Sequence, residues 1–182
     1  GLAGGLIGGV AGGISAVSDG RDFWHGGRVV NEANIDLPQM NQVGELDCRY
    51  EVFRSNDTYY NGSTEDVESL RQKFPNVEIS DKNMSKMYSS RSMALSDVTE
   101  DVKAMANKID MANDLINHMQ NNQSIIGEIS ISKNMGHAVG LRTIKVYDNG
   151  RILIRVMNSS GAGGSRFTDF NKFNRFISIS KF

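Results

Sequence analysis

Apolar residues recur at helical spacing in the middle of the chain and at alternate positions nearer its end. Between Ser96 and about Gln120 they repeat every three or four residues, which predicts one long helix with a buried face. From Ser124 onward the period changes to two, which predicts strands at residues 124–132, 136–146, 150–158 and 176–181. Helices first and antiparallel strands last predict an α+β fold.

Shorter helices are expected before this region. Asp47 is a good N-cap residue, so residues 48–55 should form a short helix that ends before a turn-rich segment. A second helix is expected from about Thr64 to Phe74, because Pro75 stops it. In the polar segment that follows, Met84 and Met87 are expected to pack inward.

The first 17 residues carry no charge, and glycine recurs in them every four positions. Small residues at that spacing let helices pack closely in a membrane. A membrane-spanning helix needs about 20 apolar residues, however, so we favour a flexible connector. We expect residues 1–30 to be a linker or junction segment and residues 31–182 to form the domain.

Charge and cysteine content narrow the functional classes. The chain has 20 basic and 21 acidic residues, so no basic excess favours a nucleic-acid partner. One cysteine cannot form an internal disulfide, and the three histidines show no zinc-ligand spacing. We therefore expect no metal site, and the cysteine chemistry considered next needs no organic cofactor.

The only cysteine, Cys48, is the first candidate for chemistry. A lone cysteine with a histidine and an asparagine far downstream is a candidate nucleophile, and His137 and Asn158 supply those partners. In the first turn of a helix, the positive end of the helix dipole favours the thiolate. Alternatively, Cys48 is a small core residue. We favour the reactive interpretation because charged residues flank it: Glu45, Asp47, Arg49 and Glu51.

His137 and Asn158 also have ordinary explanations. His137 follows Gly136 and precedes small residues that leave room around its ring, so it would fit as a half-buried strand residue. Asn158 begins Asn-Ser-Ser-Gly, which is an ordinary strand ending. Together with Gln42, six positions before Cys48, these residues make an active site the better interpretation.

The order Gln42, Cys48, His137, Asn158 resembles that of the papain-like cysteine peptidases. The Asp-Cys pair resembles the bacteriocin-leader-processing branch, and Asn-Ser-Ser-Gly is similar to the Asn-Ser-Trp-Gly of papain. The resemblance implies a helical half that carries the cysteine and a C-terminal antiparallel sheet that carries histidine and asparagine. It also implies that Cys48 is the nucleophile and His137 the acid–base group. Asn158 would orient the imidazole, and Gln42 would bind the oxyanion.

Two further residues are expected to contact the substrate. The family usually has glycine after the cysteine, whereas this chain has Arg49. Arg49 would either select an acidic substrate group or close off peptide binding. Gly136 precedes the histidine and would also lie at the substrate.

The turn between the second and third strands tests this triad. Asn149-Gly150 predicts a tight hairpin. A strict two-residue turn would pair Leu141 with Asn158, leaving His137 on the correct face but about 13 Å away along its strand. A four-residue loop, or a bulge near Gly140, would correct the stagger. We expect one of these.

A second resemblance concerns the start of the chain. A glycine-rich run closing in Gly-Arg-Asp-Phe-Trp-His-Gly, residues 20–26, resembles the junction that precedes C-terminal toxin domains of Rhs-type polymorphic toxins. His25 within it is expected to be a solvent-exposed junction residue. This resemblance implies a bacterial effector, delivered by an upstream Rhs-type domain, that acts in the target-cell cytoplasm. An immunity protein would be its partner.

Several functions stay open. The same triad would support a cysteine protease, a glutamine deamidase or an acyltransferase, acting on a protein or peptide substrate. A membrane-active toxin that works through residues 1–17 and a catalytically dead binding module are the alternatives from other classes.

Overall fold

The computed structural model describes residues 27–44, 47–78, 82–99, 101–132, 135–160 and 165–182. The helices are α2 (Cys48–Asn61), α3 (Val67–Lys73), α4 (Lys82–Ser89) and α5 (Lys108–Gln120), with a short 3-10 helix at Phe170–Lys172. The strands are β1 (Val29–Asn34), β2 (Met93–Thr99), β3 (Ser124–Ser132), β4 (Met135–Tyr147), β5 (Ile152–Met157), β6 (Ser165–Thr168) and β7 (Phe173–Lys181).

The described strands form one sheet in the order β2-β7-β3-β4-β5-β6, and β1 also pairs with β4. Every pairing is antiparallel. The long strand β4 has β5 along one edge and, along the other, β3 in its first part and β1 in its last part. The predicted α+β class is confirmed.

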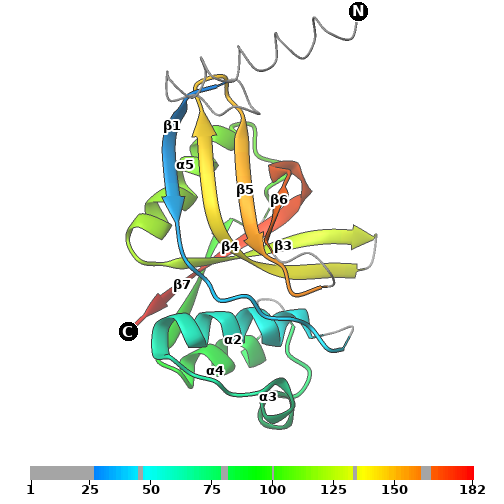
Figure 1. Ribbon diagram of the computed structural model, residues 1–182. Helices are drawn as coiled ribbons and strands as arrows, with labels where there is room; N and C mark the ends of the chain where they lie inside the picture. Colours follow the sequence, from blue (N-terminus) through cyan, green and yellow to red (C-terminus); the bar gives the residue numbers. More distant parts are fainter. Residues whose placement is uncertain (1–26, 45–46, 79–81, 100, 133–134, 161–164) are drawn as a thin grey trace, which may run out of the picture.

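The helices cover different parts of this sheet. In Figure 1, α2, α3 and α4 gather below the sheet, whereas α5 lies beside β1 and β4. Helix α2 contacts β4, and α5 contacts β1, β3 and β4. One continuous core joins these layers and includes the fully buried side chains of Phe53, Met87, Leu115 and Phe176. The sheet is not wholly C-terminal, because β1 precedes all the described helices and β2 lies between α4 and α5.

The prediction of one long helix from Ser96 is wrong in its first half. Residues 93–99 form β2, which pairs with β7 along its length. Helix α5 begins only at Lys108, where the Asn107 side chain accepts a hydrogen bond from the Asp110 N–H. The apolar spacing of residues 98–105 therefore reflects contacts with a distant strand rather than a helix face.

The helix that begins at Cys48 is longer than expected. Residues 55–58 read as a turn, but α2 continues through them to Asn61. The polar side chains there are buried and have partners: Ser55 Oγ donates to Pro38 O, and Asp57 pairs with Arg91. These tertiary contacts outweigh the local preference of Ser, Asn and Asp for turns.

Other predicted elements agree with the structure. Helix α3 ends just before Pro75, although it starts later than expected, with Asp66 as its N-cap. Met84 and Met87 of α4 are buried. All four predicted strands exist, as β3, β4, β5 and β7, while β1, β2 and β6 were not predicted.

The expected boundary between residues 30 and 31 falls within β1. Val29 already pairs with Tyr147, and the backbone of Arg28 exchanges hydrogen bonds with Asp148. The sheet therefore includes residues that we assigned to the linker. Residues 1–17 and His25 lie outside the described residues.

Candidate active site

The β4–β5 hairpin has neither the two-residue nor the four-residue turn considered above. Tyr147 N–H donates to Arg151 O, so the loop contains three residues, and Gly150 takes the positive φ of 79° that such a loop requires. With this loop alone, continued pairing would place Asn158 opposite Gly140. It would then lie on the face of the sheet away from His137.

A β-bulge at Arg142 restores the correct face. Between Leu141 and Thr143 the pairing shifts by one residue, so that Gly140 pairs with Met157. Asn158, the next residue, then lies opposite Val139 and shares a face with His137. The remaining offset is two residues, about 7 Å along the strand. The expected bulge near Gly140 is confirmed.

Cys48, His137 and Asn158 meet in the structure. His137 Nε2 lies 2.8 Å from Asn158 Oδ1. Cys48 hydrogen-bonds with the His137 side chain and with the backbone of Ala138. Since Nε2 faces Asn158, the hydrogen bond with the thiol is assigned to the other ring nitrogen, Nδ1. The imidazole thus lies between a thiol and an amide oxygen.

The Cys48 thiol lies beside a part of β4 where one strand edge is not paired with another described strand. Beyond the Gly140–Met157 pair, β5 ends, and β4 continues with β3 on one edge only. The N-terminus of α2 packs against this part of β4, which explains how the Ala138 backbone is available to the thiol. The exposed fraction of Cys48 is 5% and that of His137 is 6%.

The two reactive groups shift each other's pKa in the direction of an ion pair. Burial alone would raise the pKa of the Cys48 thiol, but hydrogen bonds from His137 and Ala138 and the charges of His137 and Arg49 lower it overall. Burial likewise opposes the charged imidazole, yet hydrogen bonds with Cys48 and Asn158 raise the pKa of His137 overall. Both shifts favour a thiolate–imidazolium pair.

A local turn fixes Asn158. Its Oδ1 accepts hydrogen bonds from the Ser160 N–H at 3.0 Å and from Ser160 Oγ at 2.9 Å, besides facing His137. The turn chemistry that we considered as an alternative role is therefore present. It holds the same oxygen that orients the imidazole, so the two roles coincide.

Gln42 reaches the site through the segment that follows β1. Ser159 fixes it twice: Gln42 N–H donates to Ser159 O at 2.8 Å, and Ser159 Oγ donates to Gln42 Oε1 at 3.3 Å. Upstream, Ile35 N–H donates to Arg142 O, and Arg142 Nε donates to Leu37 O. The bulged Arg142 therefore also anchors the segment that carries Gln42.

The acidic residues that flank Cys48 are not evidence for a reactive thiol, contrary to our argument from the sequence. Asp47 and Glu51 are themselves buried. Asp47 pairs with Arg71 and accepts from the Gly44 N–H, so it makes no side-chain cap for α2. Glu51 pairs with Arg54 at 2.8 Å, and its burial raises its pKa despite that partner. A reactive thiol is supported by His137 and by the charge of Arg49, and not by Asp47 or Glu51.

Arg49 and Gly136, the expected substrate contacts, lie on different sides of the triad. Arg49 Nη1 donates to Val77 O at 2.7 Å, so its side chain extends toward the connection between α3 and α4. A side chain on Gly136 would point toward Glu128, on the face of β4 opposite His137. Only the backbone of Gly136 could therefore touch a substrate at the thiol.

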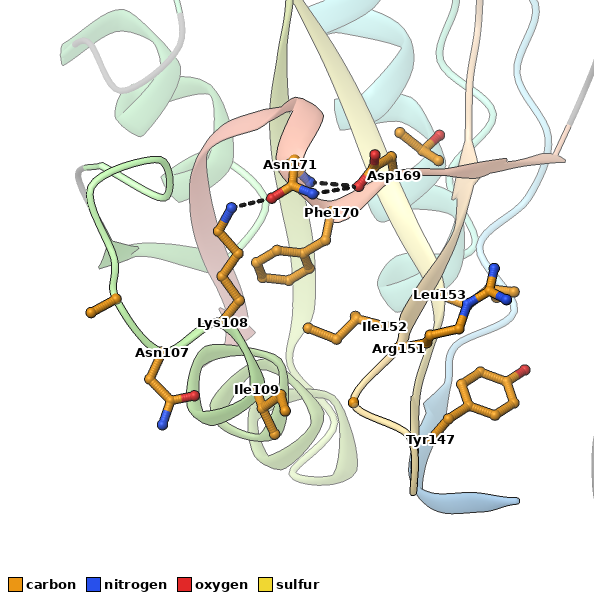
Figure 2. A pocket seen from close by; sticks show the side chains of 13 residues that line it. Asn107, Lys108, Ile109, Tyr147, Arg151, Ile152, Leu153, Asp169, Phe170 and Asn171 are labelled. Atoms are coloured by element: carbon orange, nitrogen blue, oxygen red, sulfur yellow. Dashed lines mark hydrogen bonds between the residues drawn. The ribbon is translucent and has the colours of Figure 1, made fainter. Parts of the chain in front are cut away.

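A cavity of about 700 Å³ lies at the turn end of the β4–β5 hairpin, away from the triad. Figure 2 shows it between the start of α5 and the hairpin turn, with Phe170 and Ile152 on its floor. Lys108 reaches Asn171 across one side. None of the triad residues lines it.

Three contributors to the site were missed in the sequence: Ala138, Arg142 and Ser159. Ser159 directly follows Asn158, so the Asn-Ser-Ser-Gly segment held a signal for its role. Ala138 acts through its backbone and Arg142 through a pairing irregularity, and neither has a local sequence signal.

Comparisons with known proteins do not identify a protein family for this chain. No family model matches the chain, and no curated protein matches it significantly. Within the described residues, none of the helices has the length and hydrophobicity to span a bilayer. That part of the chain also has no cluster of three His, Cys, Asp or Glu side chains suited to a metal ion. The geometry of Cys48, His137 and Asn158 therefore carries the functional argument.

Proposed function

We propose that this chain is a papain-like cysteine hydrolase that attacks a peptide or amide carbonyl. The observation that carries the proposal is His137, which contacts the Cys48 thiol with one side of its ring and Asn158 Oδ1 with the other. A buried core cysteine would need neither partner. A base that is itself oriented by a third group is the arrangement of an activated nucleophile.

In the proposed reaction, the Cys48 thiolate attacks the carbonyl carbon and the carbonyl π electrons move to oxygen. The N–H of Cys48, at the start of α2, and the Gln42 side-chain amide donate to this oxyanion. Ser159 supports that role of Gln42, because it holds the oxygen end of the amide. The oxyanion electrons then re-form the carbonyl, the carbon–nitrogen bond breaks, His137 protonates the leaving amine, and a thioester remains.

The second half of the reaction restores the thiol. His137, now neutral, takes a proton from water, and the resulting hydroxide attacks the thioester carbon. The carbon–sulfur bond breaks, the thiolate leaves, and the acid product is released. Throughout, Asn158 keeps the ring aligned, since its oxygen is held by Ser160.

We further propose that the hydrolase is a toxin domain of an Rhs-type polymorphic toxin, delivered from a bacterium into the target-cell cytoplasm. The junction-like segment at residues 20–26 supports this context. An immunity protein encoded beside it would protect the producing cell, most simply by covering Cys48.

Alkylation of Cys48 tests the enzyme proposal. Because the chain has a single cysteine, iodoacetamide labelling measured by intact mass reports on this thiol alone. We expect fast labelling near neutral pH and strong slowing in His137→Ala. His118→Ala is the matched control, because His118 lies on α5 and contacts Asp114 and Gln123 instead. Equal rates in the parent and His137→Ala would contradict the proposal.

Growth and product assays test the rest. Expression in the cytoplasm should stop growth, and Cys48→Ala should remove the effect. New N-termini in the target would indicate a protease, whereas ammonia release without cleavage would indicate a deamidase. Toxicity that survives Cys48→Ala would contradict a toxic role for this site.

A further inference from the structure

A cavity of about 670 Å³ opens beside the N-terminus of α2, within the size range of pockets that hold small ligands. One wall is the first turn of α2, with Arg49 and Tyr50, and the other is the connection between α3 and α4, with Pro75 and Val77. Tyr50 OH donates to Phe74 O at 2.7 Å and ties the two walls together. The cavity is therefore a built feature of the helical layer.

Among the described residues, Arg49 is the cation lining this cavity that pairs with no carboxylate. In the described part of the chain Arg54, Arg71, Arg91 and Arg175 each pair with at least one carboxylate. Arg49 is bonded instead to the Val77 carbonyl, and its Nε is enclosed without a hydrogen-bond partner. A half-buried guanidinium that lines a cavity and pairs with no described carboxylate suits an incoming carboxylate, which binds Arg in a two-point fork.

The other described acidic residues that line the cavity do not supply that carboxylate. Asp47 is already held by Arg71 and the Gly44 N–H. Glu78 is exposed and forms no ion pair with Arg49. The negative charge of Glu78 at the cavity would only weaken the binding of an incoming anion, without occupying Arg49.

The cavity and the thiol share the first turn of α2. Cys48 does not itself line the cavity, but Arg49, the next residue in the chain, does. An anion bound to Arg49 would thus belong to a part of the substrate near the attacked carbonyl.

We propose that this cavity is a substrate subsite in which Arg49 binds an acidic side chain, so that the hydrolase prefers peptide or amide groups beside Glu or Asp. This inference rests on the proposed function, and it assigns Arg49 as the specificity-determining residue of the same site.

Peptidyl chloromethyl ketones test the subsite, because they alkylate Cys48 without a known target. Two pairs of probes would carry Glu or Gln at either the first or the second residue before the ketone. We expect the parent to react about tenfold faster with the Glu probe of at least one pair. Arg49→Gln should remove that preference, whereas Arg49→Lys, which keeps the charge but not the fork, should retain part of it.

Glu78→Gln provides an independent arm if Arg49→Gln does not fold. Removal of the competing carboxylate should increase the preference for the Glu probe. An equal rate for Glu and Gln probes in the parent, or a preference that survives Arg49→Gln, would overturn the subsite and leave the nucleophile intact. No labelling of Cys48 by any probe in the folded parent would overturn the proposed function and the subsite with it.

Discussion

Replacement of Asn158 by alanine tests the triad most directly, because the structure predicts both the size and the direction of the effect. Asn158 Oδ1 is the described partner of His137 on the side of the ring away from Cys48. A hydrogen bond to a charged group stabilises it by about 1.5–3 kcal/mol. Since Asn158 is half-buried, we expect the lower end, about tenfold in rate.

The direction in which Asn158→Ala should shift the pH profile follows from the pKa of His137. The contact with Asn158 raises the pKa of His137, so Asn158→Ala should lower that pKa and leave less imidazolium at neutral pH. Cys48 then loses part of the charge that lowers its own pKa. The acid limb of the alkylation profile should move to higher pH, and the alkaline limb of turnover should move to lower pH.

Iodoacetamide labelling of the single cysteine across a pH series measures this shift. Asn158→Asp is the matched variant, because it keeps an oxygen acceptor and should preserve the raised pKa of His137. Ser160→Ala removes one contact to Asn158 without touching the imidazole and should change the profile little. If the profiles of Asn158→Ala and the parent superimpose while both proteins are folded, Asn158 does not orient the histidine.

Three further outcomes are expected. Gln42→Ala should retain detectable turnover, with a loss of rate on the order of 10²–10³ and little change in substrate binding, measured by single-turnover kinetics. Full activity in this variant would show that Gln42 does not bind the oxyanion. Gly127→Ala should destabilise the fold by about 1–3 kcal/mol in urea unfolding, because its Cβ would lie within 2.7 Å of the Phe173 ring. Deletion of residues 1–26 should leave Tm nearly unchanged. Deletion of residues 1–34 also removes β1 and should lower Tm by more than about 10 °C. Equal Tm values for the two deletions would show that β1 does not stabilise the fold.

The sequence predicted the chemical groups of the candidate site better than the path of the chain between them. Cys48, His137 and Asn158 could be chosen because residue type and strand period are local properties. Strands β3, β4, β5 and β7 were predictable for the same reason. Their sequences are rich in isoleucine and valine or alternate with serine, and turn residues such as Asn149-Gly150 mark their ends.

Strands β1 and β2 depended on distant partners. Burial alternates along β1, but an asparagine, Asn31, stands at one of the inward positions, so the sequence shows no apolar alternation there. Its place is set by pairing with β4, more than 100 residues later. Likewise, β2 looked helical because Val98, Val102 and Met105 happen to follow helical spacing.

The bulge at Arg142 was expected only as a geometric requirement. Nothing in Gly-Leu-Arg-Thr, residues 140–143, marks the extra residue. Its position follows from the three-residue hairpin loop together with the need for Asn158 and His137 to share a face. Polar residues within α2 were misread for a similar reason, since their partners, such as Arg91, lie far along the chain.

The position of β7 inside the sheet has a consequence for when the thiol becomes reactive. This strand, residues 173–181, joins β2 to β3, so the sheet stays incomplete until these late residues are available (Figure 1). Contacts this distant in sequence form slowly. A partly synthesised chain would carry Cys48 without the folded strand that presents His137, and its thiol would behave as an ordinary one. Activation of Cys48 thereby waits for the synthesis of β7, long after Cys48 itself has been made.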